Sequence, residues 1–334
     1  MQSSGERFLI VKTSSMGDVV HAAPLASDLA RRFPSAAIDW LVEESFAAIP
    51  RMHAAVDRVI SVAVRRWRRA PFSAATWREV RAAKEQLRAQ RYSAILDCQG
   101  LLKSAWMARW ARGTRWGFDR ASAREPLAAL LYTHAVPVAR DRHAIERNRA
   151  LGQSACGTDA AASPSFGLRA PSVAGPEWVD ATSRPYAVLL TNASRVTKRW
   201  PDERWRAVER ALHARGLRSL LFAGSAAEEQ DTRSRAAGMA DAWVAPRCGI
   251  DAVAAVLARA RIVVGLDTGL SHLAAALGAP TIGIFCDYDP RLVGIAGSAP
   301  CASLGGVSAA PTVAAAVAAV DELLAAGAVA PQTP

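Results

Sequence analysis

The sequence has few cysteines, and their spacing excludes two classes of small domain. Five cysteines are spread over 334 residues, and no two of them form a Cys-x-x-Cys pair. An odd number without paired spacing provides neither the disulfide framework of a small secreted domain nor a cysteine zinc site. We therefore expect a protein of a reducing compartment.

Long hydrophobic runs are also missing. A membrane-spanning helix needs about 18 or more uninterrupted apolar residues, and no stretch of the sequence reaches that length. The alanine-rich C-terminal tail comes nearest, but Asp321 and Glu322 interrupt it. The apolar run 8–11 is much shorter than the core of a signal peptide, and Lys12 follows it instead of a cleavage site. We expect a soluble cytoplasmic chain.

Acidic side chains are in the minority, and the imbalance lies in one half of the sequence. Lys and Arg number 41 against 30 Asp and Glu, which gives a net charge of +11. Residues 1–170 contain 26 basic and 15 acidic side chains, whereas residues 171–334 contain 15 of each. Such an excess favours an anionic partner, namely nucleic acid, a phosphorylated small molecule or a membrane surface. The two halves are therefore expected to bind different ligands.

The remaining composition is typical of a two-domain globular protein. Hydrophobic residues make up 51% and charged residues 21% of the chain, which excludes a disordered or fibrous protein. At about 150 residues per domain, the length predicts two domains. Periodicity fades over 157–185, where Ser, Pro, Gly and Ala dominate, so we expect an amino-terminal domain at 1–165 and a carboxy-terminal domain at 180–334. The final helix is a candidate for packing back onto the first domain.

Short apolar runs alternate with stretches of helical spacing in both halves. Strands are expected at 8–12, 38–42, 59–64, 94–96, 186–190, 219–222, 262–264 and 281–285, and helices at 18–32, 77–89, 101–111, 201–215, 226–237, 252–260 and 271–277. This alternation indicates βαβ units and parallel sheets. The expected class is α/β, with two Rossmann-like doubly wound domains facing across a cleft. Such sheets bind ligands at the carboxyl ends of their strands.

The loop after the first expected strand carries one candidate site. It reads Thr-Ser-Ser-Met-Gly-Asp from Thr13 to Asp18, and its single glycine does not match the dinucleotide-binding Gly-x-Gly-x-x-Gly pattern. It offers the hydroxyls of Ser14 and Ser15 and the carboxylate of Asp18 at a helix start, where the helix dipole favours a negative charge. From the loop alone, capping of the helix by Ser15 or Asp18 is the stronger interpretation.

A second candidate follows the seventh expected strand and reads Asp-Thr-Gly-Leu-Ser-His. The backbone amides of Thr268, Gly269 and Leu270 would point at a ligand above a helix start, for which phosphate is the natural choice. Asp267 could accept a hydrogen bond from a sugar hydroxyl, with His272 one turn further on. An Asp cap with a packed histidine explains the same spacing equally well.

Two more loops of the second half carry charged side chains. Lys198 precedes the helix that Pro201 opens, where a cation opposes the helix dipole unless an anion bridges the two. Ser194 lies one turn upstream and offers a hydroxyl to the same anion. Glu228, after the strand 219–222, could bind vicinal ribose hydroxyls or be a solvated acid in a helix first turn.

The densest run of charge is Arg-Arg-Trp-Arg-Arg at 65–69, and Arg124 lies in another loop of the same half. Such a run is usually a solvated face. Basic side chains interleaved with an aromatic ring, here Trp67, also fit single-stranded nucleic acid. As a third possibility, the guanidinium groups could bind phosphates or carboxylates.

Taken together, these strings resemble glycosyltransferase family 9, the ADP-heptose-dependent lipopolysaccharide heptosyltransferases. The resemblance rests on Phe-Leu-Ile-Val-Lys-Thr-Ser-Ser-Met-Gly-Asp-Val at 8–19, Arg-Arg-Trp-Arg at 65–68, Arg-Glu-Pro at 124–126, Lys198 with Trp-Pro at 200–201, and Val-Gly-Leu-Asp-Thr-Gly-Leu-Ser-His-Leu at 264–273. Two of these motifs, Ser-Ser-Met-Gly-Asp and Arg-Trp-Arg, resemble the members that add the first heptose rather than the second.

The resemblance implies a GT-B enzyme that uses neither a metal nor another cofactor. It would transfer L-glycero-D-manno-heptose from ADP-heptose to a Kdo sugar of Kdo₂–lipid A, with inversion at the anomeric carbon. Asp18 would be the general base. The donor site would consist of Ser194, Lys198, Glu228, Cys248, Asp267, Thr268, Gly269, Leu270 and His272, and the acceptor site of Lys12, Ser14, Ser15, Arg65, Arg66, Arg68 and Arg124.

The resemblance also assigns parts of the donor. Lys198 and the amides of 268–270 would hold the diphosphate, with His272 supporting the phosphate side. Glu228 would hold the ribose, Asp267 a heptose hydroxyl, and the backbone of Cys248 the adenine. The chain departs from the family before the donor lysine, where Ala193 replaces one of two frequent hydroxyl residues.

The resemblance places the protein on the cytoplasmic face of the inner membrane, as a peripheral enzyme held by its basic first half. Two alternatives remain at this point. A nucleic-acid-binding protein would explain the charge and the run 65–69, but it leaves 267–272 without a role. Another GT-B sugar-nucleotide transferase, or a heptosyltransferase that adds the second or a later heptose, would share most of the motifs.

Overall fold

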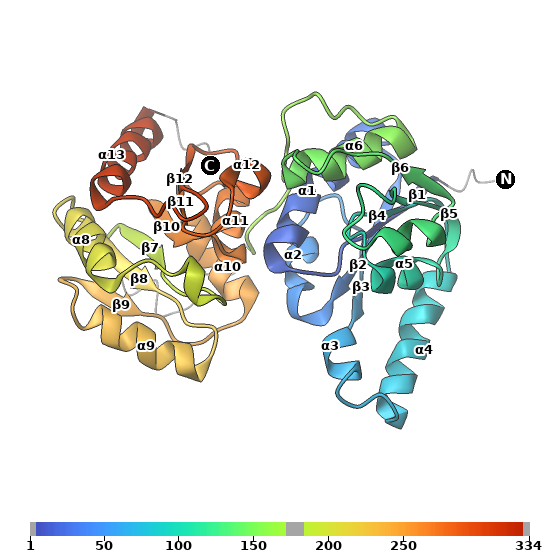
Figure 1. The fold of residues 1–334 in the computed structure, drawn as a ribbon, viewed down its shortest axis with the longest axis horizontal. Helices are drawn as coiled ribbons and strands as arrows, with labels where there is room; N and C mark the ends of the chain where they lie inside the picture. The colour runs from blue at the N-terminus through green and yellow to red at the C-terminus, as the bar shows by residue number, and fades with distance from the viewer. Residues whose placement is uncertain (1–4, 172–183, 330–334) are drawn as a thin grey trace. The chain divides into compact units, whose positions relative to one another are not determined.

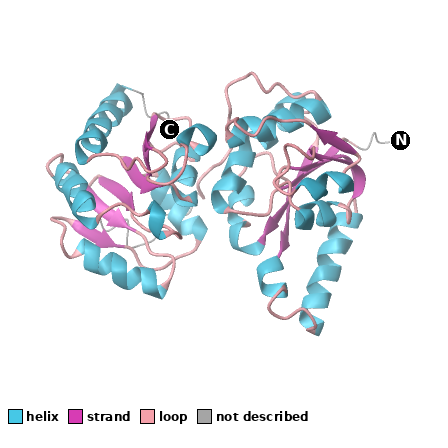
Figure 2. Ribbon diagram, viewed as in Figure 1, coloured by secondary structure: helices cyan, strands magenta, loops and turns pink. Residues whose placement is uncertain are grey.

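The computed structural model describes residues 5–171 and 184–329, and the chain forms two compact units, Met1–Arg169 and Ala170–Pro334. Each unit is built on a six-stranded sheet flanked by helices (Figures 1 and 2). The expected α/β class with two doubly wound parallel sheets is confirmed. The division between the units falls inside the expected linker 157–185, of which 172–183 lie outside the described residues.

The sheet of the amino-terminal unit has the order β3-β2-β1-β4-β5-β6, and all neighbouring strands are parallel. Its strands are β1 (Arg7–Val11), β2 (Ala37–Glu43), β3 (Arg58–Val62), β4 (Arg91–Asp97), β5 (Arg112–Phe118) and β6 (His134–Val136). Four of the five residues of β1 are buried, because a central parallel strand is covered on both faces. The order reverses between β1 and β4, so the loops after these strands lie at the switch point where such sheets bind ligands.

The helices of this unit connect the strands and cover the sheet. They are α1 (Met16–Arg32), α2 (Ala48–Arg51), α3 (Val64–Trp67), α4 (Ala74–Arg88), α5 (Leu102–Ala108) and α6 (Ala144–Cys156), with 3-10 turns η1 (Glu44–Phe46) and η2 (Pro126–Leu131). Helices α1 and α6 pack side by side. Buried Arg149 of α6 donates to both carboxylate oxygens of Asp28 on α1, at 2.6 and 3.1 Å. This ion pair fixes α1 against α6.

The sheet of the carboxy-terminal unit repeats this topology in the order β12-β11-β10-β7-β8-β9, again with parallel neighbours. Its strands are β7 (Tyr186–Leu190), β8 (Arg218–Leu221), β9 (Ala242–Val244), β10 (Ile262–Leu266), β11 (Thr281–Phe285) and β12 (Cys301–Gly305). Here the order reverses between β7 and β10. The loops after β7 and β10 therefore lie at the second switch point.

The helical elements of the second unit are η3 (Val196–Lys198), α8 (Asp202–His213), α9 (Ala226–Ala236), α10 (Ile250–Ala258), α11 (Gly269–Ala276), α12 (Pro290–Val293) and α13 (Val313–Val329). The final helix α13 packs on α8 and on β10, β11 and β12 of its own unit. Its buried Ala316, Val320 and Leu323 complete the core there. A further contact of α13 with the amino-terminal unit stays a prediction.

The expected strand 59–64 is wrong at its carboxyl end. Strand β3 stops at Val62, and Val64 begins α3. The carboxylate of Glu43 accepts hydrogen bonds from the amides of Val64 and Arg65, at 3.2 and 3.0 Å. Since an acceptor at the first free amides stabilises a helix start, Glu43 turns the chain away from the sheet at this point.

Candidate functional site

The candidate residues lie in loops that follow strands at the carboxyl edge of each sheet. In the amino-terminal unit, Lys12, Ser14, Ser15 and Asp18 follow β1, Arg65, Arg66 and Arg68 follow β3, and Arg124 follows β5. In the carboxy-terminal unit, Ser194 and Lys198 follow β7, Glu228 follows β8, Cys248 follows β9, and Asp267, Thr268, Gly269, Leu270 and His272 follow β10. The groups nearest the two switch points are therefore the Asp18 loop and the Lys198 and Asp267 loops.

Asp18 forms hydrogen bonds with the N-cap of α1 and also lies near the buried ammonium group of Lys12. Its Oδ2 accepts hydrogen bonds from the amide and the hydroxyl of Ser15, the N-cap, at 2.9 and 2.8 Å. Its Oδ1 lies 3.7 Å from Nζ of Lys12, and 31% of the Asp18 side chain remains exposed. The capping interpretation of the loop is thus correct, and the second oxygen remains available to a ligand.

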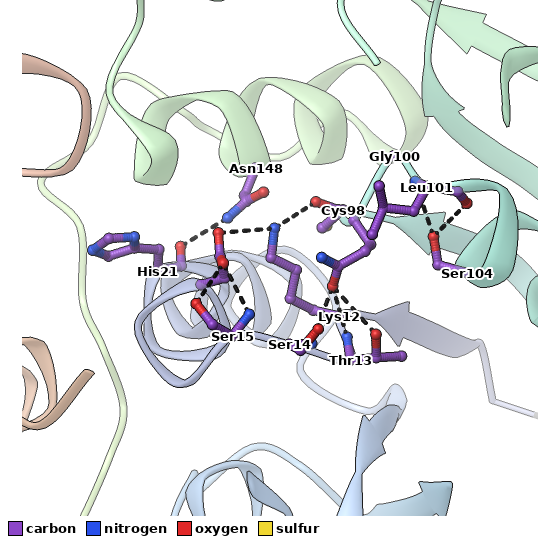
Figure 3. A network of polar contacts seen from close by, with 12 residues as sticks. Lys12, Thr13, Ser14, Ser15, His21, Cys98, Gly100, Leu101, Ser104 and Asn148 are labelled. Atoms are coloured by element: carbon purple, nitrogen blue, oxygen red, sulfur yellow. Dashed lines mark hydrogen bonds and ion pairs between the residues drawn. The ribbon is translucent and has the colours of Figure 1, made fainter. Parts of the chain in front are cut away.

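Lys12 is held in place at the end of β1. Its side chain is 9% exposed, and Nζ donates to the carbonyl of Cys98 at 2.7 Å (Figure 3). A buried ammonium group needs a compensating negative charge, and Asp18 provides it. The sequence pattern did not predict this pair, because an acceptor-binding role for Lys12 was inferred only from the resemblance.

Gln99, which the sequence analysis missed, supports the same loop from the segment that follows β4. Its Oε1 accepts hydrogen bonds from the amides of Thr13 and Ser14 at 3.0 and 3.1 Å. Figure 3 shows Thr13 and Ser14 beside Lys12. Buried Asp97 in turn accepts hydrogen bonds from the Gln99 amide at 2.9 Å and from Tyr132 Oη at 2.8 Å. The loop that carries Ser14 and Ser15 is therefore positioned by the strand next to β1 at the switch point.

The carboxylate of Asp18 stays ionised at neutral pH. Burial alone would raise its pKa, but the charge of Lys12, the hydrogen bonds from Ser15 and the charge of Arg124 outweigh burial and lower the pKa below its usual value of 3.8. Exposed Arg124 therefore acts on Asp18 although it lies in a different loop. Asp18 is accordingly able to accept a proton at any pH above the acid range.

Replacing Lys12 with methionine should raise the pKa of Asp18, because burial then acts against fewer opposing interactions. A base must be deprotonated to work, so the acid limb of the pH–kcat profile should move to higher pH. The measurement is kcat from about pH 4 to pH 8. Lys103→Met removes an exposed lysine of α5 and should leave the limb in place. An unmoved limb in Lys12→Met would contradict the pairing.

The basic run 65–69 is divided between core and surface. Trp67 is buried and donates from Nε1 to Glu79 Oε2 at 2.7 Å. It therefore cannot stack on a nucleic-acid base, and the interpretation of the run as an interleaved base-binding surface is wrong. A tertiary contact with α4, which the local sequence does not reveal, makes this ring part of the core.

Three of the four arginines expected at the acceptor site belong to this run, and their surroundings differ. Arg66 is ion-paired with Glu44 at 2.9 Å and with Glu79 at 2.8 Å. Arg65 lies over the ring of Phe46, with its guanidinium carbon 5.4 Å from the ring centre, and Arg68 is exposed. Arg65 and Arg68 thus present charge to solvent, whereas an anionic ligand would have to compete with two carboxylates for Arg66.

The structure brings together three of the expected donor residues of the second unit. Nζ of Lys198 donates to Asp267 Oδ2 at 2.5 Å and to the Asp267 carbonyl at 3.2 Å. Nε2 of His272 lies 3.3 Å from Asp267 Oδ1. Burial alone would raise the pKa of Asp267, but the hydrogen bonds from His272 and Lys198 lower it, so the carboxylate is ionised. Asp267 therefore fixes the direction of both neighbours.

Helix α11 begins beside this cluster. Its N-cap is Thr268, so the interpretation of Asp267 as the cap is wrong. Gly265 permits the close approach of helix and strand, since a Cβ there would lie 2.3 Å from Ser271 Oγ, which donates to the Leu266 carbonyl at 2.6 Å. The first amides of an α-helix have no partner within it, and next to Lys198 they form a site suited to phosphate.

Three other expected donor residues, Ser194, Glu228 and Cys248, follow β7, β8 and β9. Ser194 and Cys248 are exposed. Glu228 Oε2 accepts from the amide of Gly224 at 2.8 Å, and Ser225 caps α9 by accepting from the Glu228 amide at 3.2 Å. Residues 5–171 and 184–329 contain no group of three His, Cys, Asp or Glu side chains arranged to hold a metal ion.

Comparison with known proteins shows the family to which the chain belongs. The model of glycosyltransferase family 9 (heptosyltransferase) matches residues 80–315. The sequence is 44% identical over 296 residues to lipopolysaccharide heptosyltransferase 1 of Escherichia coli K12, which covers 86% of this chain and 90% of that protein. It is also 44% identical over 293 residues to lipopolysaccharide heptosyltransferase 1 of Pseudomonas aeruginosa, covering 87% of this chain and 81% of that protein.

Solved structures show the same architecture. E. coli heptosyltransferase WaaC with ADP superposes with a TM-score of 0.84 at 40% identity, covering 95% of this chain and 99% of that chain. WaaC with ADP-2-deoxy-2-fluoro heptose superposes with a TM-score of 0.78 at 38% identity, covering 96% of this chain and 99% of that chain. E. coli heptosyltransferase II shares the fold, with a TM-score of 0.74 at 20% identity. This match covers 96% of this chain and 98% of that chain.

Proposed function

Since the chain belongs to glycosyltransferase family 9, the heptosyltransferases, we propose that it adds the first heptose of the lipopolysaccharide core. It is a glycosyltransferase that transfers heptose in the synthesis of this core. The proposed donor is ADP-L-glycero-D-manno-heptose, and the proposed acceptor is a hydroxyl of Kdo in Kdo₂–lipid A. The observation that carries the proposal is the ionised Asp18 at one switch point and the Lys198–Asp267–His272 cluster at the other.

The proposed reaction is a single displacement with inversion. The Kdo hydroxyl oxygen attacks the anomeric carbon, the bond from that carbon to the β-phosphate oxygen breaks, and ADP leaves with the electron pair. Asp18 takes the proton from the hydroxyl. The low pKa of Asp18 does not prevent this transfer. The attacking hydroxyl becomes strongly acidic as the new bond forms, so proton transfer to a positioned carboxylate is favourable late in the step.

The leaving diphosphate gains negative charge as the bond breaks. Lys198 and the first amides of α11 would stabilise this charge without a metal, because donors fixed in advance need no reorganisation during the reaction. Asp267 holds Lys198 at 2.5 Å and would also orient a heptose hydroxyl. Glu228 would hold the ribose and the backbone of Cys248 the adenine. The ADP bound by WaaC, at 40% identity, supports an ADP donor.

The acceptor would be bound by the basic loops of the amino-terminal unit. Lys12, Ser14, Ser15 and Arg124 would surround the Kdo beside Asp18, and Arg65, Arg66 and Arg68 would meet acceptor phosphates and carboxylates. The proposed base and the proposed diphosphate site belong to different units, so the transfer would use residues of both. No helix among the described residues is long and apolar enough to span a bilayer. We place the enzyme in the cytoplasm, peripherally on the inner membrane.

Acceptor binding should respond more strongly to salt than ADP binding does. The first 170 residues hold 26 basic and 15 acidic side chains, whereas the remainder is balanced, and exposed charges are screened beyond about 8–10 Å at physiological salt. Raising NaCl from about 0.05 to 0.5 M should therefore raise the acceptor KM steeply and the ADP Kd only weakly. Equal slopes for the two ligands would contradict this assignment of ligands to units.

The proposed function is tested by ADP release. Purified protein with ADP-heptose should release ADP rapidly when Kdo₂–lipid A is present and slowly without it. Kdo₂–lipid A that already carries one heptose is the matched control and should not accelerate release. Acceleration by the heptosylated acceptor alone would favour a heptosyltransferase that acts later, and no acceleration by either would reject the proposal.

A further inference from the structure

We infer that the turn between α3 and α4 is a membrane anchor that inserts an aromatic side chain into the anionic leaflet. We call residues 64–81, which comprise α3, this turn and the first two turns of α4, the α3–α4 tip. The inference rests on the proposed peripheral location and assigns it to a specific surface. Figure 1 shows α3, the loop and the start of α4 projecting beyond the sheet of the amino-terminal unit. A projecting element can touch a flat bilayer, whereas a concave surface cannot.

Two aromatic side chains of the α3–α4 tip are exposed to solvent instead of being packed in the core. Phe72 is 94% exposed, and Trp77, in the first turn of α4, is 62% exposed. Neither ring contributes to the core, and large apolar groups exposed together in a soluble protein indicate an interaction site. Phenylalanine and tryptophan are also the side chains that insert at membrane interfaces.

The tip is rigid enough to present these rings. Buried Trp67 is anchored to Glu79 on α4, and Arg66 binds the same carboxylate at 2.8 Å. Thr76 Oγ1 donates to the carbonyl of Ala70 at 2.9 Å, and Ser73 Oγ accepts from the Thr76 amide at 3.2 Å. The loop around Phe72 is thus fixed from both sides, so its exposure is a built feature of the fold.

The charge of the tip matches an anionic surface. Its six arginines, all exposed, are Arg65, Arg66, Arg68, Arg69, Arg78 and Arg81. Its one acid, Glu79, is already engaged by Arg66 and Trp67. A segment that combines exposed aromatic rings with several arginines and one acid fits a leaflet of anionic lipid, to which juxtamembrane arginines are attracted. The proposed acceptor ligands are three of the six, which leaves Arg69, Arg78 and Arg81 without another role.

The position of the tip links anchoring to the reaction. Helix α3 begins two residues after β3 ends, at the carboxyl edge of the sheet that also carries the Asp18 loop. Insertion of Phe72 would therefore bring this edge close to the leaflet that contains a lipid-linked acceptor. The alternative, a lid that closes over the acceptor sugar, would use the same residues for binding the sugar.

Sedimentation with vesicles separates these alternatives. The wild type should bind vesicles of phosphatidylglycerol and phosphatidylethanolamine, without acceptor, and should bind phosphatidylcholine vesicles weakly. Phe72→Ser should lower the partition coefficient about tenfold, equivalent to about 1.4 kcal/mol, and Phe72→Trp should retain it. Arg69→Gln and Arg78→Gln should each lower it about fivefold. Leu130→Ser removes an apolar residue of η2 that is 67% exposed and should have no effect.

Two transfer assays complete the test. Phe72→Ser should lose heptose transfer to acceptor embedded in vesicles but keep wild-type transfer to the deacylated, water-soluble acceptor. Equal loss on both acceptors would show a lid and overturn the anchor, as would vesicle binding that is unchanged in Phe72→Ser or that requires acceptor in the vesicle. If the wild type transfers heptose to neither acceptor, the proposed function fails, while the sedimentation result still decides the anchor.

Discussion

Asp18→Ala is expected to lower kcat by roughly 10²–10⁴-fold, the usual contribution of a positioned general base. Affinity for ADP-heptose should change little, because Asp18 lies in the amino-terminal unit and the diphosphate cluster in the other. The measurement is steady-state turnover with saturating donor and acceptor, together with donor Kd by calorimetry.

Two variants separate catalysis from helix capping. Asp18→Asn keeps an oxygen that can accept from Ser15, so α1 should remain capped while the base is lost; its thermal melting should resemble that of the wild type and its kcat that of Asp18→Ala. Glu146→Gln removes another first-turn acid, exposed on α6, and should keep full activity. Wild-type turnover in Asp18→Asn would show that Asp18 serves only to cap the helix.

Lys198→Ala should lower kcat/KM by about 10²–10³-fold, the effect of removing one fixed donor from a developing negative charge. The loss should appear partly in donor binding, because the ammonium group meets the diphosphate before the reaction as well as during it. It also leaves Asp267 without the cation that lies 2.5 Å away, so a carboxylate that keeps only its contact with His272 would repel the phosphates.

Arg199→Ala is the matched control for Lys198→Ala. Arg199 is the next residue of the same loop, carries the same charge and is exposed. It should lose less than about threefold, as expected of a surface charge that is screened by solvent. A double variant, Lys198→Ala with Asp267→Asn, should recover part of the donor affinity if repulsion by Asp267 contributes. Similar losses in Lys198→Ala and Arg199→Ala would instead indicate a general effect of loop charge.

The central strands could be predicted because burial on both faces leaves a continuous apolar signal. Strands β1 and β10 read Arg-Phe-Leu-Ile-Val and Ile-Val-Val-Gly-Leu, and both were expected within one or two residues. Strand β5 was missed because it reads Arg-Gly-Thr-Arg-Trp-Gly-Phe and is largely half-exposed. Strands β6 and β9, of three residues each, are too short to show a period. The edge strand β12 was missed as well.

Helix α6 was missed for a different reason. Its sequence contains Glu-Arg-Asn-Arg, which hides the apolar face. Asn148 and Arg149 are nevertheless buried, because Asn148 donates to the His21 carbonyl at 3.0 Å and Arg149 pairs with Asp28. Polar side chains that are buried by pairing across two helices cannot be recognised from one helix alone. The alanine-rich α13 was expected as a final helix, although its bounds could not be predicted.

The candidate site was predicted in part. The loops of Asp18 and Asp267 could be found because each directly follows a central apolar strand, and parallel sheets gather such loops at one edge. The partners of these residues could not. Gln99, held by Asp97, reaches the Asp18 loop only because β4 pairs with β1. The ion pair of Arg66 with Glu79 depends on where α4 packs. The resemblance to family 9 was confirmed by the comparisons, whereas the individual site residues remain predictions.

The stereochemistry of the product tests the central claim most directly. A single displacement assisted by one base, Asp18, must invert the anomeric carbon. Heptose should therefore be transferred from ADP-heptose of known anomeric configuration to Kdo₂–lipid A, and the new linkage determined by NMR from its one-bond carbon–hydrogen coupling. The proposal predicts the configuration opposite to that of the donor. A product with the configuration of the donor would contradict it.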